Sequence, residues 1–520
     1  HGNSWLMEEK ADFLPAATGQ RDKFGDARTG QDWYYSAKRA LLAPFGVGTV
    51  DQALLGVVAA KHFFVRHFAL AGKVVILDEI HSYDLYTGTL IDRLVVALEG
   101  LGCTVIILSA TLTGKRRGQV VSFPEDNNAD PSSLPYPLIT GRDDGRGPLR
   151  ISANPPKSRE VEVLFQSTES AVTEAVELAD EGGAVLWVCD TINSAQSQYQ
   201  ILSERTAGRF PVGLLHSRFP FWRREELEKE WMERLGKNST TRCGSILVST
   251  QIVEQSVDLD ADLLITELAP TDMLLQRMGR LWRHKRKGRP LAAPRFRILK
   301  EEKSLDEFER MEKKDIMKAL GGKAYVYAPF VLLRTLKVWN DLKRVSIPSQ
   351  IRGLIEATYA EGEDDPTAWQ ELFDKKFGKN LGEKFLAARN CNLWQAALED
   401  EEGVQTRLNE IPTLSLVLCH SATTERVVLF DGSKEPLGGD EFRLATAQAI
   451  HRNLVKVALH HFESPKECEG FELYLHGAQT IGLVHEDGSI SVRGLKNGVR
   501  LLWSNALGLA IEKASDGEEE

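Results

Sequence analysis

Two adjacent carboxylates follow an apolar run in the first hundred residues. Residues 73–77 read Lys-Val-Val-Ile-Leu, and Asp78-Glu79-Ile80-His81 come directly after them. In open α/β sheets, ligands bind at the carboxyl ends of the strands. An Asp there can hold Mg²⁺ through water beside nucleotide phosphates, and the neighbouring Glu can orient or deprotonate the attacking water. His81 can couple this site to a neighbouring element. An acidic surface loop is the alternative interpretation.

An arginine-rich segment is the second candidate. Residues 276–283 read Gln-Arg-Met-Gly-Arg-Leu-Trp-Arg. Arg280 and Arg283 are three positions apart, so a helix would present both guanidinium groups on one face. Their planar forks suit phosphate oxygens. If they reach a nucleotide held by another domain, they act as arginine fingers, which contribute about 10³ to 10⁵ in rate to phosphoryl transfer. The alternative is a solvated basic helix face.

Two polar segments also follow apolar runs. Ser109-Ala110-Thr111 ends the run that starts at residue 103, and its hydroxyls can link the acidic cluster to a facing domain. A turn or helix N-cap is the alternative there. Residues 249–258 read Ser-Thr-Gln-Ile-Val-Glu-Gln-Ser-Val-Asp. Such a segment can contact a nucleic-acid backbone at one end and a nucleotide at the other, or it is simply a polar loop.

Composition and charge set limits on the class of protein. The 520 residues are 42% hydrophobic and 27% charged, which is ordinary globular usage. The net charge of −10 argues against a protein that coats nucleic acid electrostatically. Residues 280–300 nevertheless carry lysines and arginines without an acid, and we expect Lys285, Arg286 and Lys287 to hold DNA phosphates. No apolar stretch is long enough for a membrane helix, and no CxxC pair occurs, which favours a reducing cytoplasm.

The rhythm of apolar runs predicts an α/β fold with parallel sheets. We expect strands at 73–78, 103–109, 184–189, 212–215, 245–249 and 263–267, and helices at 85–98, 194–202 and 222–235. Continuous apolar runs indicate strands that are buried on both faces. Residues 122–158 are rich in Pro, Asp, Asn and Gly and predict a linker. The expected domains are 1–150 and 151–300, both α/β, a helical linker at 301–345, and a smaller accessory domain at 346–520.

In order, these segments (DEIH, SAT, STQIVEQSVDLD and QRMGRLWR) resemble motifs II, III, V and VI of superfamily 2 helicases. Residues 48–54, 70–84 and 347–359 further resemble the CRISPR-associated helicase–nuclease of type I interference systems. The resemblance implies two RecA-like domains with ATP at their interface, the first of them incomplete in this sequence. It also implies 3′-to-5′ translocation on single-stranded DNA, recruitment by a guide-RNA surveillance complex that has opened an R-loop, and DNA degradation in antiviral defence in a prokaryotic cytoplasm.

The resemblance also assigns roles to residues, motif by motif. Asp78 and Glu79 would serve Mg²⁺ and water. The coupling residues would be His81, Ser109, Ala110 and Thr111. The side chains facing the nucleotide would be Asp258, Gln276, Arg280 and Arg283. The candidates for the DNA backbone would be Thr49, Gln52, Ser249 and Thr250.

This sequence departs from the family pattern in two respects. It contains no Gly-x-x-x-x-Gly-Lys-Ser/Thr, the loop that cradles the β- and γ-phosphates. None of its twelve His precedes an Asp, although the family's nuclease uses His-Asp ligands for transition metals. Both parts precede residue 1 in the family, so we expect an upstream segment or a separate chain to supply them.

Two other functions stay open at this point. One is a non-catalytic DNA-binding or scaffold module derived from a helicase, which the missing phosphate loop favours. The other is a repair or restriction helicase of the same superfamily.

Overall fold

The structure is a computed structural model that divides into two compact units. The first unit is His1–Leu112 with Lys375–Ile411 and Arg443–Gln448, and the second unit is the remainder of the chain. The described residues are 40–59, 63–80, 85–121, 136–143, 147–240, 242–255, 257–359, 365–373, 412–438, 442–463, 470–471, 473–475 and 479–513. None of the helices in these ranges is long and apolar enough to cross a membrane.

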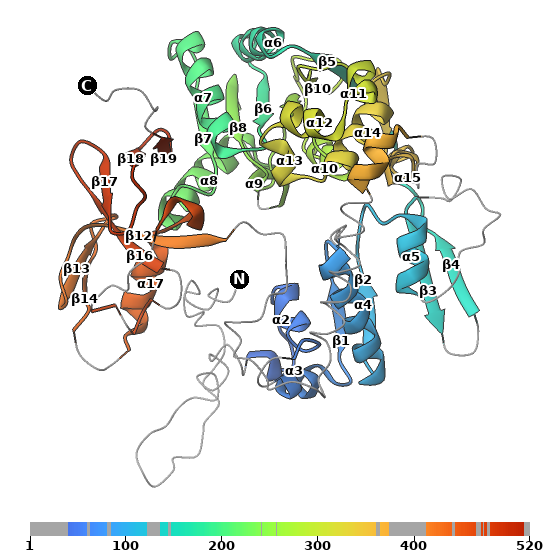
Figure 1. Ribbon diagram of the computed structural model, residues 1–520. Helices are drawn as coiled ribbons and strands as arrows, with labels where there is room; N and C mark the ends of the chain where they lie inside the picture. The colour runs from blue at the N-terminus through green and yellow to red at the C-terminus, as the bar shows by residue number, and fades with distance from the viewer. Residues whose placement is uncertain are drawn as a thin grey trace. The chain divides into compact units, whose positions relative to one another are not determined.

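The first unit contains the predicted strand–helix–strand segment (Figure 1). Strands β1 and β2 are parallel, with Val74 opposite Thr104. The residues with helical apolar spacing, at 90, 91, 94, 95 and 98, are all buried on α4. This confirms the predicted βαβ pattern. In chain order the elements are η2 (Ala40–Leu42), α2 (Val50–Leu54), α3 (Phe63–Leu70), β1 (Val74–Leu77), α4 (Leu85–Gly100) and β2 (Thr104–Ile107).

One face of the β1–β2 sheet departs from the prediction of strands buried on both faces. Val74 is 63% exposed and Ile76 is 59% exposed, and Ile106 on the neighbouring strand is exposed as well. The buried side chains of this sheet face the core that contains α4. Among the described residues, α4 packs against β2 on the buried face, and the side chains of the other face are exposed.

The second unit is built around a seven-stranded sheet in the order β11-β5-β10-β9-β6-β8-β7. All neighbouring pairs are parallel except β11 with β5. Every residue of β6, β8 and β9 is buried, as their continuous apolar runs predicted. The elements from β5 to β10 are β5 (Arg159–Gln166), α6 (Thr168–Asp180), β6 (Ala184–Val188), α7 (Ile192–Thr206), β7 (Val212–Leu215), α8 (Phe221–Leu235), β8 (Ser245–Ser249), α9 (Ile252–Gln255), β9 (Leu263–Thr266), α10 (Thr271–Met278) and β10 (Arg295–Leu299).

The core of this sheet extends beyond the predicted boundaries at 300 and 345. Apolar residues such as Phe308, Leu332 and Trp339 are fully buried in the same core as the central strands. A predicted linker helix therefore packs as part of the domain, because its apolar band needs a partner surface. The added elements are α11 (Leu305–Arg310), α12 (Lys313–Leu320), α13 (Lys323–Val326), α14 (Pro329–Trp339), β11 (Arg344–Ile347) and α15 (Ile351–Tyr359).

The predicted linker at 122–158 is only partly a linker. Within it, β3 (Leu138–Asp143) and β4 (Gly147–Ser152) pair antiparallel, with Ile139 opposite Ile151. Helix α5 (Gly114–Val120) precedes it, capped by the Thr113 hydroxyl. The alternation of Ile, Thr, Leu and Arg supports strand structure between the turn-forming residues that dominated the prediction.

The C-terminal part of the second unit is an eight-stranded mixed sheet with β12 at its centre (Figure 1). This region had mixed helix and strand signals in the sequence, and its strands fill two small cores. We call it the accessory sheet. Its elements are β12 (Thr413–Ala422), β13 (Arg426–Leu429), β14 (Lys434–Pro436), β15 (Leu454–Ala458), β16 (Gln479–Val484), β17 (Ser489–Val492), β18 (Val499–Ser504) and β19 (Gly508–Lys513), with α17 (Leu444–Arg452) and η5 (Leu459–His461) between strands.

The turn between β18 and β19 contacts the carboxyl end of β7 through a buried histidine. His216 Nε2 lies 3.0 Å from the Leu507 carbonyl oxygen, and its Nδ1 accepts the Arg218 amide at 3.1 Å. Phe219 stacks on the His216 ring, and Gln196 donates to the Leu507 carbonyl at 2.7 Å. Both ring nitrogens are used by a neutral imidazole with its proton on Nε2. Burial lowers the pKa of His216 to about 4.

This contact predicts a pH dependence. Between pH 4 and about 6.5 the unfolded chain binds a proton at His216 that the folded protein does not, so the free energy of unfolding should rise with pH across this window. His216→Gln, which does not titrate, should flatten that rise in urea unfolding measured at several pH values. Exposed His485→Gln serves as the control. Parallel curves for wild type and His216→Gln would contradict the assignment.

Candidate functional site

The acidic pair lies at the carboxyl end of β1, as predicted. Asp78 and Glu79 are both exposed, and the Glu79 amide donates to Asp78 Oδ1 at 2.9 Å. Glu79 has φ +55°, a left-handed conformation that is uncommon for a residue with a side chain and that concentrates at functional sites. The backbone therefore turns sharply at this position. His81 lies outside the described residues.

The Ser-Ala-Thr segment lies beside the acidic pair. The Leu108 amide donates to the Leu77 carbonyl at 2.9 Å, and the Ile80 amide donates back to the Leu108 carbonyl at 3.3 Å. Ser109 accepts the Thr111 amide on its hydroxyl at 3.3 Å, and Ala110 is exposed. The parallel strands thus bring two predicted motifs together at one sheet edge. Their coupling role stays a prediction.

Thr49 and Gln52 lie at the start of α2. Thr49 is the N-cap residue, with an extended backbone. The main-chain oxygen of Gln52 accepts from Arg66 Nε at 3.1 Å, and its side-chain oxygen accepts from Arg66 Nη2 at 3.5 Å. Arg66 is buried, so it fixes Gln52 from the protein side. The predicted DNA contact of both residues stays a prediction.

Ser249 is placed differently from the prediction that it contacts the DNA backbone. It is fully buried, and its hydroxyl donates to the Leu215 carbonyl at 2.7 Å. Thr250 is also buried. The Ser249 hydroxyl therefore joins the ends of β8 and β7 inside the sheet edge, because a buried hydroxyl needs a partner.

A fully buried arginine links the segments around the arginine motif. Arg277 Nε donates to Glu254 Oε1 at 2.7 Å, and its Nη2 lies 3.2 Å from Asp190 Oδ1. Its remaining donors reach Thr266 Oγ1 at 2.5 Å and Tyr327 Oη at 3.0 Å. Asp190 follows β6, Glu254 lies on α9, Thr266 is the last residue of β9, and Tyr327 directly follows α13. One guanidinium thus holds four segments against α10.

The charges of this network influence one another. Burial raises the pKa of Asp190 to about 7, and this effect outweighs the lowering by Arg277. Burial also raises the pKa of Glu254. For Arg277 itself, burial acts to lower the pKa, but the surrounding groups, among them Glu254 and Asp190, raise it well above its usual range. The guanidinium stays charged, and its two acids compete for it.

The two arginines predicted to face the nucleotide make different contacts. Arg280 is buried and donates to the main-chain oxygen of Glu254. Gln276 is half-buried on α10. Arg283 is 43% exposed and pairs with Asp258 at 2.5 Å, and Asp258 also lies 3.1 Å from His284 Nε2. The structure therefore brings Asp258 and Arg283 together, while their contact with a nucleotide stays a prediction.

The predicted DNA-binding triplet does not act as a unit. Lys285 and Lys287 are exposed. Arg286 instead pairs with the fully buried Asp260 at 2.5 Å and donates to the Gly236 carbonyl. A buried carboxylate has to be paired, so Arg286 is turned inward.

The sequence analysis missed Arg277, Asp190, Glu254 and Tyr327. One signal for Arg277 was present. It lies three positions after Leu274, which is buried on α10, so helical spacing places it on the apolar face. Its partners lie 23, 50 and 87 residues away in the chain, and no local pattern indicates them.

Comparisons with known proteins agree with this architecture. Residues 181–286 match the family "CRISPR-associated nuclease/helicase Cas3, C-terminal". The "CRISPR-associated endonuclease/helicase Cas3" of Thermus thermophilus is 33% identical over 428 residues, which are 73% of this chain and 45% of that protein. The protein of the same name from Escherichia coli is 31% identical over 421 residues, 76% of this chain and 45% of that protein. The structure of T. fusca Cas3 with AMPPNP superimposes with a TM-score of 0.77 at 26% identity, covering 98% of this chain and 61% of that one.

Two RecA-like α/β parts and a C-terminal region therefore define a helicase core. Within that class, the chain is a relative of the CRISPR-associated nuclease/helicases named Cas3, and the family predicted from its motifs is confirmed. The chain spans about half the length of the curated relatives it matches, 45% of each.

The Arg277 network makes a prediction about stability. Arg277→Ala leaves Glu254 and Asp190 buried without their cation, so the free energy of unfolding should fall by about 3–5 kcal/mol. Arg283→Ala, which removes an exposed pair, should change it by about 1 kcal/mol or less. Urea unfolding of both variants measures the difference. Equal losses would show that the network does not carry this stability.

Proposed function

We propose that this chain is the motor part of a CRISPR-associated helicase–nuclease. It uses ATP to translocate 3′-to-5′ along single-stranded DNA, after a guide-RNA surveillance complex has opened an R-loop in the prokaryotic cytoplasm. DNA cleavage, with transition metals, comes from a nuclease part that these 520 residues do not contain. An upstream segment or a separate chain supplies that part and the phosphate loop.

One observation carries the proposal. Four helicase-like motifs occur in their usual order on a chain whose relatives are named Cas3. In each unit, the polar segments follow parallel strands at the carboxyl edge of a sheet, as Asp78 and Thr250 do. Structures of T. fusca Cas3 with AMPPNP, ADP and ATP are similar to this chain, which supports a nucleotide as its substrate.

The described residues fit part of a nucleotide site. The exposed carboxylates Asp78 and Glu79 suit Mg²⁺ held through water, and the metal would neutralise phosphate charge. Arg280 and Arg283 suit phosphate oxygens. The phosphate cradle itself is absent from the sequence, so turnover requires a phosphate loop from elsewhere.

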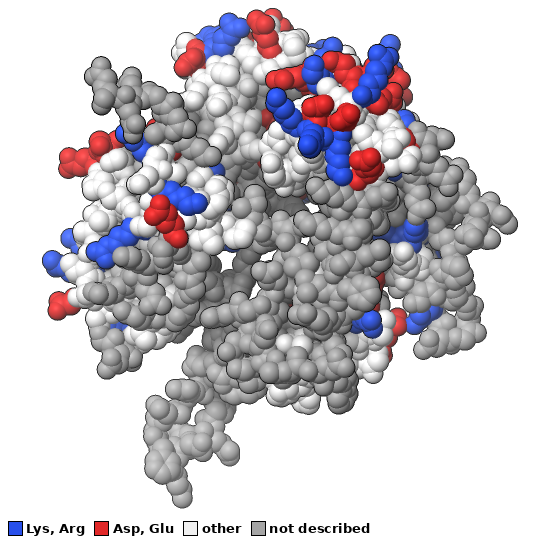
Figure 2. All heavy atoms as spheres, in the orientation of Figure 1, with Lys and Arg blue, Asp and Glu red and all other residues white. Residues whose placement is uncertain are grey.

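DNA binding has to come from local positive charge. On the face of the molecule seen in Figure 2, lysines and arginines around α11–α14 are interspersed with acids. Lys285 and Lys287 are exposed and are not among the groups that pair with the buried aspartates. We propose that these two lysines contact DNA phosphates, together with Thr49 and Gln52.

A scaffold without catalysis is the second candidate. The missing phosphate loop in these 520 residues favours it. It predicts that the protein binds DNA and the surveillance complex but shows no ATP turnover, even when the upstream part of the same gene product is present. ATP turnover by that complete protein would exclude the scaffold. A repair or restriction helicase would then remain as an alternative, and binding to the surveillance complex would test it.

The first test is Arg280→Ala in the protein that carries the phosphate loop. DNA-stimulated ATP turnover should fall by about 10³-fold or more if Arg280 stabilises charge on the transferred phosphate, while DNA affinity stays the same. Arg223→Ala, which removes a surface pair with Glu226, is the matched control. Near-normal turnover in Arg280→Ala would refute the finger assignment.

The second test distinguishes the two exposed lysines, Lys285 and Lys287, from the inward-turned Arg286. Lys285→Ala/Lys287→Ala should weaken DNA binding and reduce the slope of log affinity against log salt by about 1.4, roughly 0.7 for each lost contact with a single strand. Arg286→Ala should mainly lower the melting temperature, because its partner Asp260 is buried. Fluorescence anisotropy over a salt series reports the slopes. An unchanged slope in the double variant would place the DNA elsewhere.

A further inference from the structure

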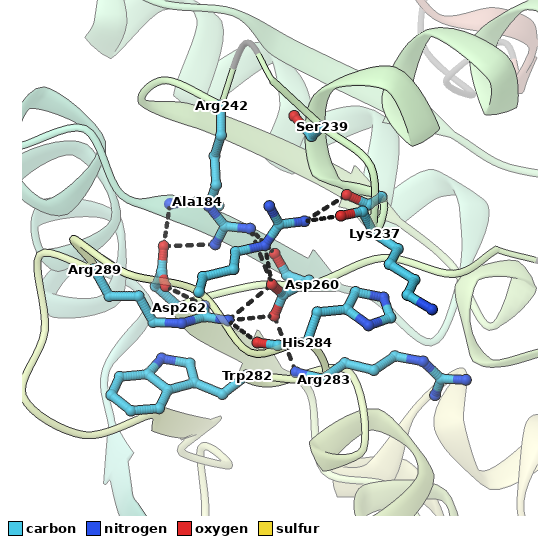
Figure 3. Close-up of polar contacts among 12 residues, drawn as sticks. Ala184, Lys237, Ser239, Arg242, Asp260, Asp262, Trp282, Arg283, His284 and Arg289 are labelled. Carbon is cyan, nitrogen blue, oxygen red and sulfur yellow. Dashed lines mark hydrogen bonds and ion pairs between the residues drawn. The ribbon is translucent and has the colours of Figure 1, made fainter.

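Two fully buried carboxylates lie directly before the strand β9. Asp260 and Asp262 are surrounded by three arginines that come from two different segments (Figure 3). Arg242 lies 2.7 Å from Asp262, and Arg289 bridges both acids, 2.6 Å from Asp262 and 2.8 Å from Asp260. Arg286 pairs with Asp260 at 2.5 Å. The charges are compensated inside the fold, so this cluster is not an open anion or cation site.

The same segment holds the end of the arginine motif by its main chain. The Ala261 amide donates to the Arg280 carbonyl, and the Trp282 amide donates to the Ala261 carbonyl, each at 3.0 Å. The Arg283 amide donates to Asp260 Oδ1 at 3.0 Å. Asp260 Oδ1 accepts from the Arg283 amide and also from Arg289 Nη2 at 3.0 Å, and its Oδ2 accepts from arginine side chains only.

The backbone turns sharply just before Arg283. Trp282 has φ +44°, a conformation that a residue with a side chain adopts only when its surroundings impose it. Arg159 donates to the Trp282 carbonyl at 2.7 Å, and the Arg289 guanidinium lies 4.9 Å from the centre of the Trp282 ring. The turn sends the Arg283 side chain away from the two carboxylates (Figure 3). There it pairs with Asp258.

The two acids differ in one respect. Asp262 accepts from the Ala184 amide and from Arg242 and Arg289, and it has no contact with the main chain of 280–283 among the contacts of the described residues. Asp260 alone reaches Arg283.

We propose that Asp260 is a positioning residue for Arg283 in ATP hydrolysis. Its Oδ1 holds the Arg283 amide, and with it the turn at Trp282, so that the guanidinium projects from the correct point. This inference rests on the proposed function, in which Arg283 meets the nucleotide phosphates. A misplacement of about 1 Å at such a group can cost about 10²-fold in rate.

The test uses the DNA-stimulated ATPase of the protein that carries the phosphate loop. Asp260→Ala should lower kcat by about 10²-fold with little change in KM for ATP. Asp260→Asn keeps an oxygen that can accept the Arg283 amide and should recover most of kcat despite the lost charge. Asp262→Ala is the matched control, with a similar loss of buried charge and kcat near that of wild type.

A double-mutant cycle shows whether Asp260 acts through Arg283. Asp260→Ala in an Arg283→Ala background should cause no further loss of kcat. Multiplicative losses, or an equal loss of kcat in Asp262→Ala, would overturn the positioning role. If Arg283→Ala alone leaves kcat unchanged, it is the finger role in the proposed function that fails.

Stability is measured beside the kinetics. If Asp260→Ala does not fold, the double variant Asp260→Ala/Arg286→Met is tested instead. It removes the acid together with one guanidinium that the acid would leave unpaired. Its kcat is compared with that of Arg286→Met alone. A loss specific to the double variant supports the proposal, and equal kcat values contradict it.

Discussion

A single buried positive charge determines how the second unit is arranged at the edge of its sheet. Arg277 is fully buried, and an arginine in that position is tolerated only when its donors are matched by acceptors. Glu254, Asp190 and Tyr327 supply them from three segments, which follow β8, β6 and α13. The positions of these segments are therefore interdependent, and the arginine motif cannot move without disturbing all of them.

Buried charges of the opposite sign, which also need partners, lie earlier in the chain. Asp260 and Asp262 are buried anions, and they draw in arginines that the sequence alone would assign to DNA. The two networks meet at the arginine motif. Arg280 is bonded to the main chain of Glu254, and Arg283 is bonded through its amide to Asp260. The fold thus fixes the Arg280 side chain and the main chain at Arg283 within the second unit.

The accessory sheet is tied to the same edge. The turn before β19 bonds to His216 and Gln196, and Trp222 donates to Asn453 at 3.1 Å. Because His216 lies at the carboxyl end of β7, the segment that follows this strand depends on the accessory sheet for its position. This gives the C-terminal region a structural role in the second unit that its weak sequence signals did not indicate.

The sequence by itself determined the family and many of the strands and helices before residue 300. Continuous apolar runs predicted β6 to β9 closely, and helical spacing predicted α4, because both patterns are local. The order of the motifs indicated a helicase of superfamily 2, and residues 48–54, 70–84 and 347–359 indicated the narrower family. Only the tertiary structure decided that Ser249 and Arg286 turn inward and that β3 pairs with β4. It also decided that α14 packs in the core of the seven-stranded sheet, to which β11 belongs. It also revealed the roles of Arg277 and Asp260. These outcomes depend on pairing between buried charges that are tens of residues apart in the chain, and on apolar surfaces that pack in one core. Such pairings arise only when the carboxyl ends of the strands are brought to one edge.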